Sequence, residues 1–430
     1  MHFSFELSYT PFSITKSMKL FFLGISGTLM GNLALIAKEL GHEVEGADAK
    51  VYPPMSDQLK KANISFLEGF TKENFREADK YIIGNVVSRG NELLEYILDA
   101  DKNIESGPAW LYENILKDRE VIAISGTHGK TSVTTMIAHG LNALDVNPGY
   151  LIAGVPLGAM NSFNLGSNKN FIIEADEYDT CYFDKNPKFL HYHPKLLVVN
   201  NIEFDHADIF NNIEQIEGRF IELMQSMNAE SSVLINASGV RQKFLERINS
   251  TEIQCSVTEI KAGGKDFHEA NLNISKAVIK IISNLQKDVD VFINFSGVKR
   301  RFETIFNNEK FTIIDDFAHH PTAIEKALEK VESEFKNVVL ILEFGSNTMK
   351  RGLHNEEIKK ILETRETYLV NVSKEQQVFF DNCTILEKSN LADLLIGRDS
   401  DHTAILMCSN KNFLGLQKDL VSLISSQTNK

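Results

Sequence analysis

Short continuous apolar runs alternate along this chain with longer stretches of helical period. From Lys19 the chain reads as an apolar run KLFFLG, a glycine turn ISGTLMG, a helical pattern NLALIAKELG and a second candidate strand EVEGAD. Apolar runs bounded by glycine are typical of buried strands, and apolar residues three or four positions apart are typical of helices. The pattern therefore predicts a strand–turn–helix–strand unit from Lys19 onward.

The same alternation continues through the middle of the chain. KYIIGN, EVIAISG, FIIEAD and LLVVNNI are further candidate strands, and TSVTTMIAHGLNAL is a candidate helix. SGPAWLYENIL predicts another helix, entered through Ser106 with a proline in its first turn. Continuous apolar strands separated by helices are typical of parallel sheets covered on both faces.

A last unit of this kind begins near Phe295. The candidate strands FTIIDDF and VVLILEF flank the helical pattern PTAIEKALEKVESEF. A chain of 430 residues is too long for one compact core and predicts several domains. We expect an α/β protein with a tail at residues 1–17 and domains at 18–117, 118–294 and 295–430.

Composition limits the classes of partner and compartment. The formal net charge of −13 argues against nonspecific nucleic-acid binding, and small anions are the expected partners. Four cysteines without a C-x-x-C pair indicate neither a disulfide framework nor a zinc site, which fits a reducing cytoplasm. No apolar stretch approaches the length of a membrane span, and the first 17 residues lack the pattern of a signal peptide, so Met18 is a candidate start. The cysteines are Cys181, Cys255, Cys383 and Cys408.

The segment GTHGKT, residues 126–131, resembles a phosphate-binding loop between a strand and a helix. Its glycines allow backbone N–H groups to approach phosphate oxygens at a helix N-terminus. Lys130 can hold the β- and γ-phosphates, and the hydroxyl of Thr131 can reach a magnesium ion. The first glycine of the usual pattern is replaced by Ile124. The alternative is a glycine turn with an exposed lysine, but the flanking strand and helix favour a phosphate site.

Two polar segments follow neighbouring candidate strands and suggest a metal site. Glu174 lies at the end of FIIEAD, and Asp205 and His206 follow LLVVNNI. Magnesium prefers carboxylate oxygens, and the carboxyl ends of parallel strands meet at one edge of a sheet. The alternatives are a solvated acidic turn and a structural histidine. The acidic turn would comprise Glu174, Asp176, Glu177 and Asp179.

The first glycine turn contains Gly24, Gly27 and Gly31, with Asp48 after the next strand. Its spacing departs from G-x-G-x-x-G, so it is a weak signal for NAD. It is a better signal for a diphosphate at a helix N-terminus.

Two segments of the last domain carry further charged residues. Arg300 and Arg301 could bring positive charge to a transferred phosphate, although adjacent arginines are more often a surface pair. The segment DDFAHHPTA follows a strand, and its polar residues could alternatively cap the next helix. These residues are Asp315, Asp316, His319 and His320.

Taken together, these motifs resemble those of the Mur ligases, the ATP-dependent amide-forming enzymes of peptidoglycan metabolism. The glycine loop, GTHGKT, EADE, DHADIF, RRFE and DDFAHHPTAI occur in the order that the family uses, from Met18 onward. The resemblance implies a three-domain architecture: a Rossmann-like N-terminal domain, a central P-loop ATPase-like domain and a Rossmann-like C-terminal domain. It also implies ATP and Mg²⁺ as cofactors.

Four stretches resemble the branch of the family that works in cell-wall recycling: DAKVYPPMS, GNVVSRGN, SGPAWL and SNTMK. This resemblance implies that UDP-N-acetylmuramate is joined to the tripeptide L-alanyl-γ-D-glutamyl-meso-diaminopimelate through an acyl phosphate, giving ADP and phosphate. The expected partners are these two substrates, with no nucleic acid or membrane, and the expected state is a monomer or a weak homo-oligomer.

The resemblance assigns roles residue by residue. It implies that Lys130, His206 and Arg301 are catalytic and that Thr131, Glu174 and His206 hold magnesium. The implied nucleotide-binding residues are Gly126, Thr127, His128, Gly129, Lys130, Thr131, Ser132, Asn271, Asp316 and His319. The implied residues for the UDP-sugar and peptide are Gly24, Ser26, Gly27, Thr28, Asp48, Asn85, Ser88, Ser106 and Asn347.

The chain departs from the family in three places, which keeps other hypotheses open. The stretch between DHADIF and the third domain is shorter than is usual in the family. Gly345 stands where the family has an arginine in E-P-R-S-N-T, and GGKDFHEANLN keeps Asn271 without the usual preceding His-Asn pair. The alternatives are a UDP-N-acetylmuramate:L-alanine ligase and a nucleotide-binding Mur-like protein with impaired turnover. An NAD-dependent enzyme built on the first glycine loop is a third hypothesis.

Overall fold

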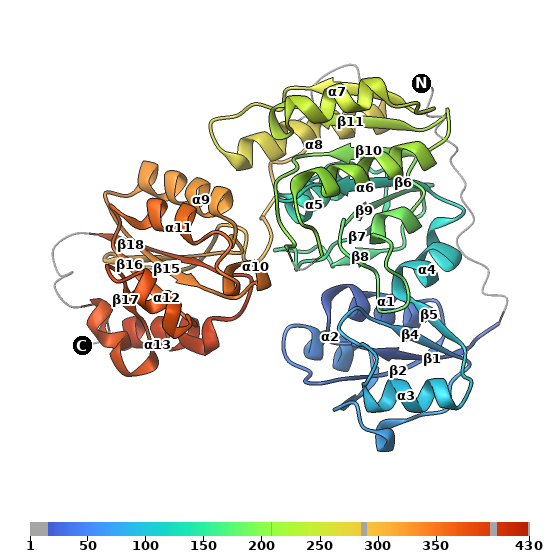
Figure 1. The fold of residues 1–430 in the computed structure, drawn as a ribbon, viewed down its shortest axis with the longest axis horizontal. Helices are drawn as coiled ribbons and strands as arrows, with labels where there is room; N and C mark the ends of the chain where they lie inside the picture. Colours follow the sequence, from blue (N-terminus) through green and yellow to red (C-terminus); the bar gives the residue numbers. More distant parts are fainter. Residues whose placement is uncertain (1–15, 208, 285–289, 396–401, 429–430) are drawn as a thin grey trace. The chain divides into compact units, whose positions relative to one another are not determined.

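The computed structural model describes residues 16–207, 209–284, 290–395 and 402–428 (Figure 1). Two compact units divide the chain. The first contains the residues up to Glu203 together with Glu214–Gly263 and Ala270–Ser296. The second contains Phe204–Ile213, Gly264–Glu269 and Gly297–Lys430. Most of the predicted tail, residues 1–15, lies outside the described residues.

The first unit begins with a five-stranded parallel sheet of order β3-β2-β1-β4-β5. Because β1 lies between β2 and β4, the loop that follows β1 occupies the point where the strand order reverses, which is where open α/β sheets bind ligands. The strands are β1 Lys19–Leu23, β2 Glu43–Asp48, β3 Ser65–Glu68, β4 Lys80–Ile83 and β5 Ile104–Ser106. The helices are α1 Thr28–Glu39, α2 Met55–Lys61, α3 Glu92–Asp99 and α4 Gly107–Leu111, with a 3₁₀ turn η1 at Lys72–Asn74 and a π-helical turn η2 at Tyr112–Leu116.

Alternate side chains of β1 pack against helices on opposite faces of this sheet. Phe21 and Leu23 share one buried cluster with Ile97 of α3. The intervening Phe22 makes an edge contact with Trp110 of α4, at 6.2 Å between ring centroids. With both faces covered, polar ligands can reach the sheet only at the strand ends.

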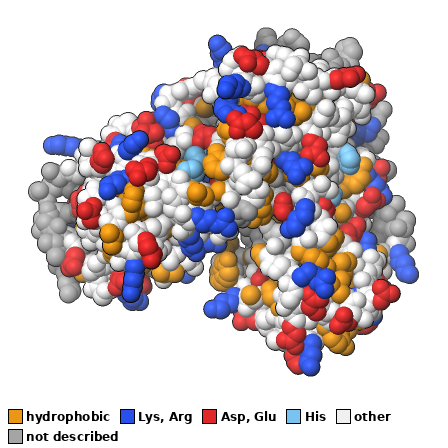
Figure 2. Space-filling model, viewed as in Figure 1, with side chains coloured by type: hydrophobic (Ala, Val, Ile, Leu, Met, Phe, Trp, Pro, Cys, Tyr) orange, Lys and Arg blue, Asp and Glu red, His pale blue; other side chains and the backbone are white. Residues whose placement is uncertain are grey.

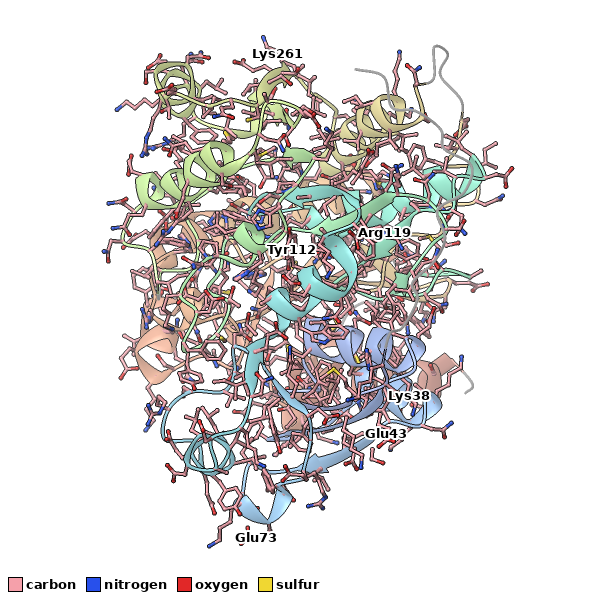
Figure 3. All side chains as sticks on the ribbon, turned by 90° about the vertical axis from the view of Figure 1, so that its right-hand side faces the viewer. Lys38, Glu43, Glu73, Tyr112, Arg119 and Lys261 are labelled. Carbon is pink, nitrogen blue, oxygen red and sulfur yellow. The ribbon has the colours of Figure 1, made fainter. Side chains whose placement is uncertain are left out.

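Figure 3 labels residues at the amino-terminal edge of this sheet and on the chain that leaves it. Lys38 in the last turn of α1 and Glu43 at the start of β2 lie at that edge, opposite the glycine loop. Tyr112 begins the π-helical turn through which the chain continues toward Arg119 and the second sheet.

The second sheet has seven strands in the order β12-β11-β10-β6-β9-β7-β8, and its pairs are parallel except for β7 with β8. The strands are β6 Glu120–Ser125, β7 Gly149–Leu151, β8 Phe163–Asn164, β9 Asn170–Glu174, β10 Leu196–Val199, β11 Ser232–Asn236 and β12 Ser256–Ile260. The helices are α5 Lys130–Ala143, α6 Ile213–Ser226, α7 Gln242–Ser250 and α8 Phe267–Ser283, with 3₁₀ turns η3 Lys188–His191 and η4 Ala237–Gly239.

The apolar core of this sheet explains where its phosphate-loop candidate lies. Ile122 and Ile124 of β6 pack in one buried cluster with Val133 of α5 and Val278 of α8. The side chain of Ile124, which occupies the place of the usual first glycine, is therefore a core contact. Since β6 lies between β10 and β9, the loop from β6 to α5 again occupies a point of reversed strand order.

The second unit is built on a six-stranded sheet of order β13-β14-β18-β15-β16-β17, parallel except for β13 with β14. The strands are β13 Glu303–Asn307, β14 Phe311–Asp316, β15 Asn337–Glu343, β16 Thr367–Val370, β17 Thr384–Ile385 and β18 Thr403–Cys408. The helices are α9 Pro321–Glu334, α10 Asn347–Lys350, α11 Asn355–Leu362, α12 Lys374–Phe379 and α13 Leu416–Thr428, with 3₁₀ segments η5 Lys388–Leu395 and η6 Phe413–Gly415. Leu340 and Leu342 of β15 belong to one buried cluster, and Val339 and Ile341 to another, so helices cover both faces.

The predicted alternation of strands and helices is confirmed in all three sheets. β2 coincides with EVEGAD, and α9 begins at the predicted proline, whereas α1 begins at Thr28, before the apolar pattern becomes helical. Segments 204–213 and 264–269, which fall within the predicted central domain, group with the second unit. The predicted domain boundaries remain a prediction.

On the face shown in Figure 2, acidic and basic residues are interspersed. Among the described helices, none combines the length and the apolar character that a bilayer span requires.

A stability prediction follows from the close approach of β2 to β1. A Cβ atom on Gly46 would lie 2.5 Å from the backbone oxygen of Phe22. Because a backbone atom inside a sheet cannot move aside, Gly46→Ala is expected to destabilise the protein by about 1–3 kcal/mol. Thermal unfolding measures the effect. In the control Gly263→Ala, the Cβ would have no described heavy atom within 4 Å, and an equal loss in both variants would contradict the prediction.

Candidate functional site

The phosphate-loop candidate follows β6 and has the backbone that such a loop needs. Gly126 and Gly129 have φ of 143° and 82°, which L-residues rarely adopt. A Cβ on Gly129 would lie 2.6 Å from Oδ1 of Asn271 and 2.9 Å from Nδ2 of Asn200. Glycine is therefore required both by the backbone conformation and by two neighbouring amides. The structure places Asn271, predicted as a nucleotide contact, beside this loop.

Lys130 is the first residue of α5, and its side chain lies among oxygen acceptors at the carboxyl edge of the middle sheet. Its Nζ donates to the backbone oxygen of Gly126 at 2.6 Å. The same atom lies 3.7 Å from a carboxylate oxygen of Asp176 and 3.6 Å from one of Glu177. These carboxylates hold the ammonium group over the loop, where a bound phosphate would compete for it.

Thr131 and Glu174 lie on different elements but contact each other, as two ligands of one magnesium ion would have to. The Thr131 hydroxyl donates to Oε2 of Glu174 at 2.9 Å, joining the first turn of α5 to the end of β9. The other oxygen, Oε1, accepts the N–H of Ala153 at 2.6 Å. A hydroxyl and a carboxylate at one strand edge are the oxygen ligands that Mg²⁺ prefers. These two residues therefore fit a magnesium ion, whose location here remains a proposal.

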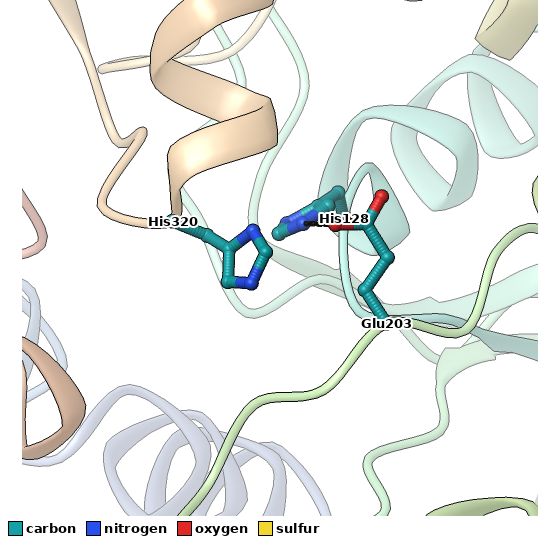
Figure 4. A group of neighbouring side chains, drawn as sticks. All are labelled: His128, Glu203 and His320. Atoms are coloured by element: carbon teal, nitrogen blue, oxygen red, sulfur yellow. Dashed lines mark ion pairs between the residues drawn. The ribbon is translucent and has the colours of Figure 1, made fainter. Parts of the chain in front are cut away.

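Two asparagines that the sequence analysis did not select hold the loop in place. Asn201 accepts the N–H of His128 at 2.8 Å and donates to its carbonyl oxygen at 2.9 Å, as a neighbouring strand would. Asn200 donates to Asn271 at 3.0 Å. The available signal was that both residues lie near the end of the candidate strand LLVVNNI, directly after its apolar part. The His128 side chain lies 3.4 Å from the Glu203 carboxylate, the ion pair drawn in Figure 4.

The glycine loop of the first sheet is closed by Asp48. Its Oδ2 accepts the N–H of Ser26 at 2.8 Å and the Ser26 hydroxyl at 2.5 Å, and its Oδ1 accepts the N–H of Ala49. α1 begins at Thr28, and the residue before it, Gly27, provides no side chain to cap the helix N-terminus. Asp48 thus orders the loop, and its predicted contact with substrate remains a prediction.

Other predicted substrate residues lie along the same sheet. Ser106, at the end of β5, caps α4 by accepting the N–H of Ala109 at 3.4 Å. Asn85 and Ser88 are exposed in the loop after β4. All three therefore lie at the carboxyl edge that carries the glycine loop.

In the second unit, Asp316 joins the arginine segment to the end of β14. It accepts the N–H groups of Phe302 at 2.7 Å and Ala318 at 2.8 Å. Burial raises the pKa of Asp316, and the positive charge of Arg301 opposes that rise. The Arg301 guanidinium lies 4.4 Å from the ring centroid of Phe317. The side chain of His320, the residue before α9, makes no capping bond, whereas Pro321 begins the helix. The capping alternative is therefore wrong for the His320 side chain and is confirmed for the proline.

Asp205 and His206 belong to the second unit. Asp205 accepts the Thr348 hydroxyl at 3.1 Å and the N–H of His206 at 2.7 Å, and lies 4.0 Å from Nε2 of His319. Burial alone would raise the pKa of Asp205, but the charges of His206 and His319 hold it well below its usual range. His206 has φ of 56°, uncommon for a residue with a side chain. Because Thr131 and Glu174 lie in the first unit, the three-residue metal site remains a prediction.

The space beside Gly345 is occupied by the chain after β18. A Cβ on Gly345 would lie 2.5 Å from Oδ1 of Asn410 and 2.6 Å from Cγ of Lys411. A larger residue at this position would have to displace both side chains. Asn347 is exposed at the start of α10, and Ser346 caps that helix by accepting the N–H of Met349 at 3.1 Å.

Three α/β sheets, with a phosphate-loop candidate on the middle one, define a multidomain nucleotide-binding α/β protein. Family models cover most of the chain: "Mur ligase family, catalytic domain" at residues 19–119, "Mur ligase middle domain" at 124–301, and "Mur ligase, glutamate ligase domain" at 300–387. The chain belongs to the Mur ligase family. It is an ATP-dependent ligase that forms a C–N bond, and members of this family typically use Mg²⁺.

Proteins of this family are similar to this chain over nearly its whole length. The UDP-N-acetylmuramate–L-alanyl-γ-D-glutamyl-meso-2,6-diaminoheptandioate ligase of Haemophilus influenzae is 34% identical over 93% of this chain and 97% of its own. A crystal structure of a murein peptide ligase from Psychrobacter arcticus has 29% identity and a TM-score of 0.72, covering 94% of this chain and 98% of that one. The UDP-N-acetylmuramate-alanine ligase of Thermotoga maritima, at 21% identity, has the same fold, with a TM-score of 0.76 over 95% of this chain and 100% of that one. The predicted three-domain Mur ligase architecture is confirmed.

A binding prediction follows from the amide that pairs with His128. Asn201→Ala removes both hydrogen bonds to the loop backbone, at about 1 kcal/mol each, and is expected to weaken nucleotide binding by about 30-fold. Calorimetric titration with a non-hydrolysable ATP analogue measures the change. Asn273→Ala is the matched control, because the partner of the Asn273 amide among the described residues is Gly263, on an exposed segment away from the loop backbone. Equal affinities in the two variants would show that Asn201 does not shape the loop.

Proposed function

We propose that this enzyme joins UDP-N-acetylmuramate to L-alanyl-γ-D-glutamyl-meso-diaminopimelate in peptidoglycan recycling, with ATP cleaved to ADP and phosphate. The relative from Haemophilus influenzae is named as a ligase of these two substrates and aligns with 93% of this chain. The observation that carries the chemistry is the Thr131–Glu174 pair beside the Lys130 loop. This arrangement suits a nucleotide with its metal, on a different sheet from the glycine loop.

The proposed reaction makes a carboxylate reactive before the amide forms. A carboxylate oxygen of the muramate lactyl group attacks the γ-phosphorus, ADP leaves, and an acyl phosphate results. The alanine amine then attacks the acyl carbon, the tetrahedral intermediate expels phosphate, and the nitrogen loses a proton. The first step brings two anions together, so positive charge must stabilise the transition state. Lys130 would supply this charge at the γ-phosphate.

The remaining predicted residues take roles around these two steps. Thr131 and Glu174 would hold the magnesium ion, which neutralises phosphate charge when bound, with His206 as a further ligand facing the substrate carboxylate. Arg301 would approach the phosphates, while Asp316 and His319 would contact the nucleoside with Asn271. Water must be kept from an acyl phosphate, so closure of the third domain over the site is part of the proposal. We also propose that the enzyme is cytoplasmic and is a monomer or a weak homo-oligomer.

Two alternatives remain within this family. L-alanine alone could be the acceptor, as in the Thermotoga maritima ligase with the same fold. Gly345 favours the other alternative, impaired turnover, because no side chain extends from this position and Asn410 and Lys411 occupy the space.

Product analysis decides between these functions. The enzyme is given UDP-N-acetylmuramate, MgATP and an equimolar mixture of L-alanine and tripeptide, and the products are identified by mass spectrometry. We expect the UDP-N-acetylmuramyl tripeptide as the main product. A main product carrying L-alanine alone would overturn the assignment of the acceptor, and binding of both substrates without any amide would indicate impaired turnover.

Removing the loop lysine should separate catalysis from sugar binding. Lys130→Ala is expected to lower turnover at least about a hundredfold, because the transferred phosphate loses its main cation. UDP-N-acetylmuramate should bind with unchanged affinity, since its proposed site is the glycine loop of the first sheet. Phosphate release and calorimetry measure the two quantities. Loss of UDP-sugar binding in this variant would contradict the separation of the two sites.

A further inference from the structure

One polar side chain interrupts the apolar interior of α1. Residues Met30–Ala37 of this helix are all buried, and Asn32, which is 1% exposed, is the one among them with a polar side chain. Its Nδ2 donates to the backbone oxygen of Ile152, in the loop after β7, at 3.2 Å. Its Oδ1 has no hydrogen-bond partner among the described residues. Because a buried amide is unfavourable unless it is hydrogen-bonded, the bond to Ile152 is the contact that accounts for an asparagine here.

The acceptor of this bond belongs to the peptide group that also holds Glu174. The carbonyl of Ile152 accepts from Asn32, and the N–H of the same peptide group, on Ala153, donates to Oε1 of Glu174 at 2.6 Å. In a trans peptide the C=O and N–H point in opposite directions, so this group is held from both sides. A hydrogen bond to its carbonyl also polarises its N–H and strengthens the bond that the N–H donates.

A continuous series of hydrogen bonds therefore connects two sheets. It runs from Asn32 through the peptide group of Ile152 and Ala153 to Glu174, and from Glu174 to the hydroxyl of Thr131 at 2.9 Å. At one end, α1 begins directly after the glycine loop of the first sheet. At the other end, Thr131 lies in the first turn of the helix after the phosphate loop.

We infer that Asn32 is a positioning residue that couples the two substrate sites. By holding the Ile152–Ala153 peptide group, it fixes the orientation in which Glu174 faces Thr131. A UDP-sugar that orders the start of α1 then favours the arrangement that binds the magnesium nucleotide, and by linkage the nucleotide favours the UDP-sugar equally. This inference rests on the proposed function, because it takes the UDP-sugar to the glycine loop and the nucleotide to Thr131 and Glu174.

Wild-type protein gives the first test. The dissociation constant of UDP-N-acetylmuramate is measured by calorimetry with and without a saturating magnesium complex of a non-hydrolysable ATP analogue. We expect the analogue to tighten sugar binding at least about fivefold. Identical constants would overturn the inference without any variant.

Variants of Asn32 give the second test. Asn32→Leu keeps a similar volume without a donor, and Asn32→Ala is used if the leucine disturbs folding. Either is expected to reduce the coupling to less than about twofold and to speed hydrogen exchange of the Ala153 amide at least about tenfold in ligand-free protein. The control Leu33→Ala removes a core side chain next along α1, and it should lower the thermal stability without changing either quantity. Unchanged coupling and unchanged exchange in the Asn32 variant, or equal changes in the control, would overturn the inference.

A variant of the carboxylate separates this inference from the proposed function. Glu174→Gln should weaken binding of the magnesium nucleotide if the proposed metal role is correct. If Glu174→Gln weakens that binding while the Asn32 variants behave as wild type, the positioning role of Asn32 is wrong and the metal role stands. If Glu174→Gln leaves the binding unchanged, the metal role and the inference built on it both fail.

Discussion

Parallel strands that are buried on both faces constrain everything else in this protein. Each of the three sheets consists mainly of parallel strands, and in the first and last sheets helices pack against both sides. The buried side chains along these strands are therefore mostly apolar, and polar groups that could do chemistry gather at the ends of the strands and in the turns that follow them. The candidate residues of the first unit obey this rule: the glycine loop follows β1, the phosphate loop follows β6, and Glu174 ends β9.

The strand ends do more than gather polar side chains. In the middle sheet, β6 lies beside β10, and this brings Asn201 to the backbone of His128, more than 70 residues earlier in the chain. The side-chain amide of Asn201 thus gives the backbone of the phosphate loop the hydrogen bonds that a neighbouring strand would give it. In the first sheet, Asp48 performs a similar task for Ser26. Both contacts position backbone N–H groups, which are the groups that receive phosphate oxygens.

Much of this could be predicted from the sequence, because local patterns determine it. The segment EVEGAD, which follows a glycine turn and a helical pattern, predicts β2, and the proline before TAIEKALEKVESEF sets the start of α9. The meeting of Thr131 and Glu174 could also be predicted, since both follow strands of one parallel sheet. Asn200, Asn201 and Asn32 could not, because their partners depend on which strands are neighbours and on how α1 packs. No local pattern distinguishes a pairing amide from an ordinary loop asparagine.

The grouping of segments 204–213 and 264–269 with the second unit makes the chain pass between the units five times, after residues 203, 213, 263, 269 and 296. Two units joined by a single linker could be separated by one cut, but these cannot. A fragment beginning at Gly297 would lack Asp205, which receives the Thr348 hydroxyl inside the second unit, and would leave that buried hydroxyl without its acceptor. Each unit is therefore assembled from several segments of the chain, and a fragment that begins at Gly297 does not contain the whole of the second unit.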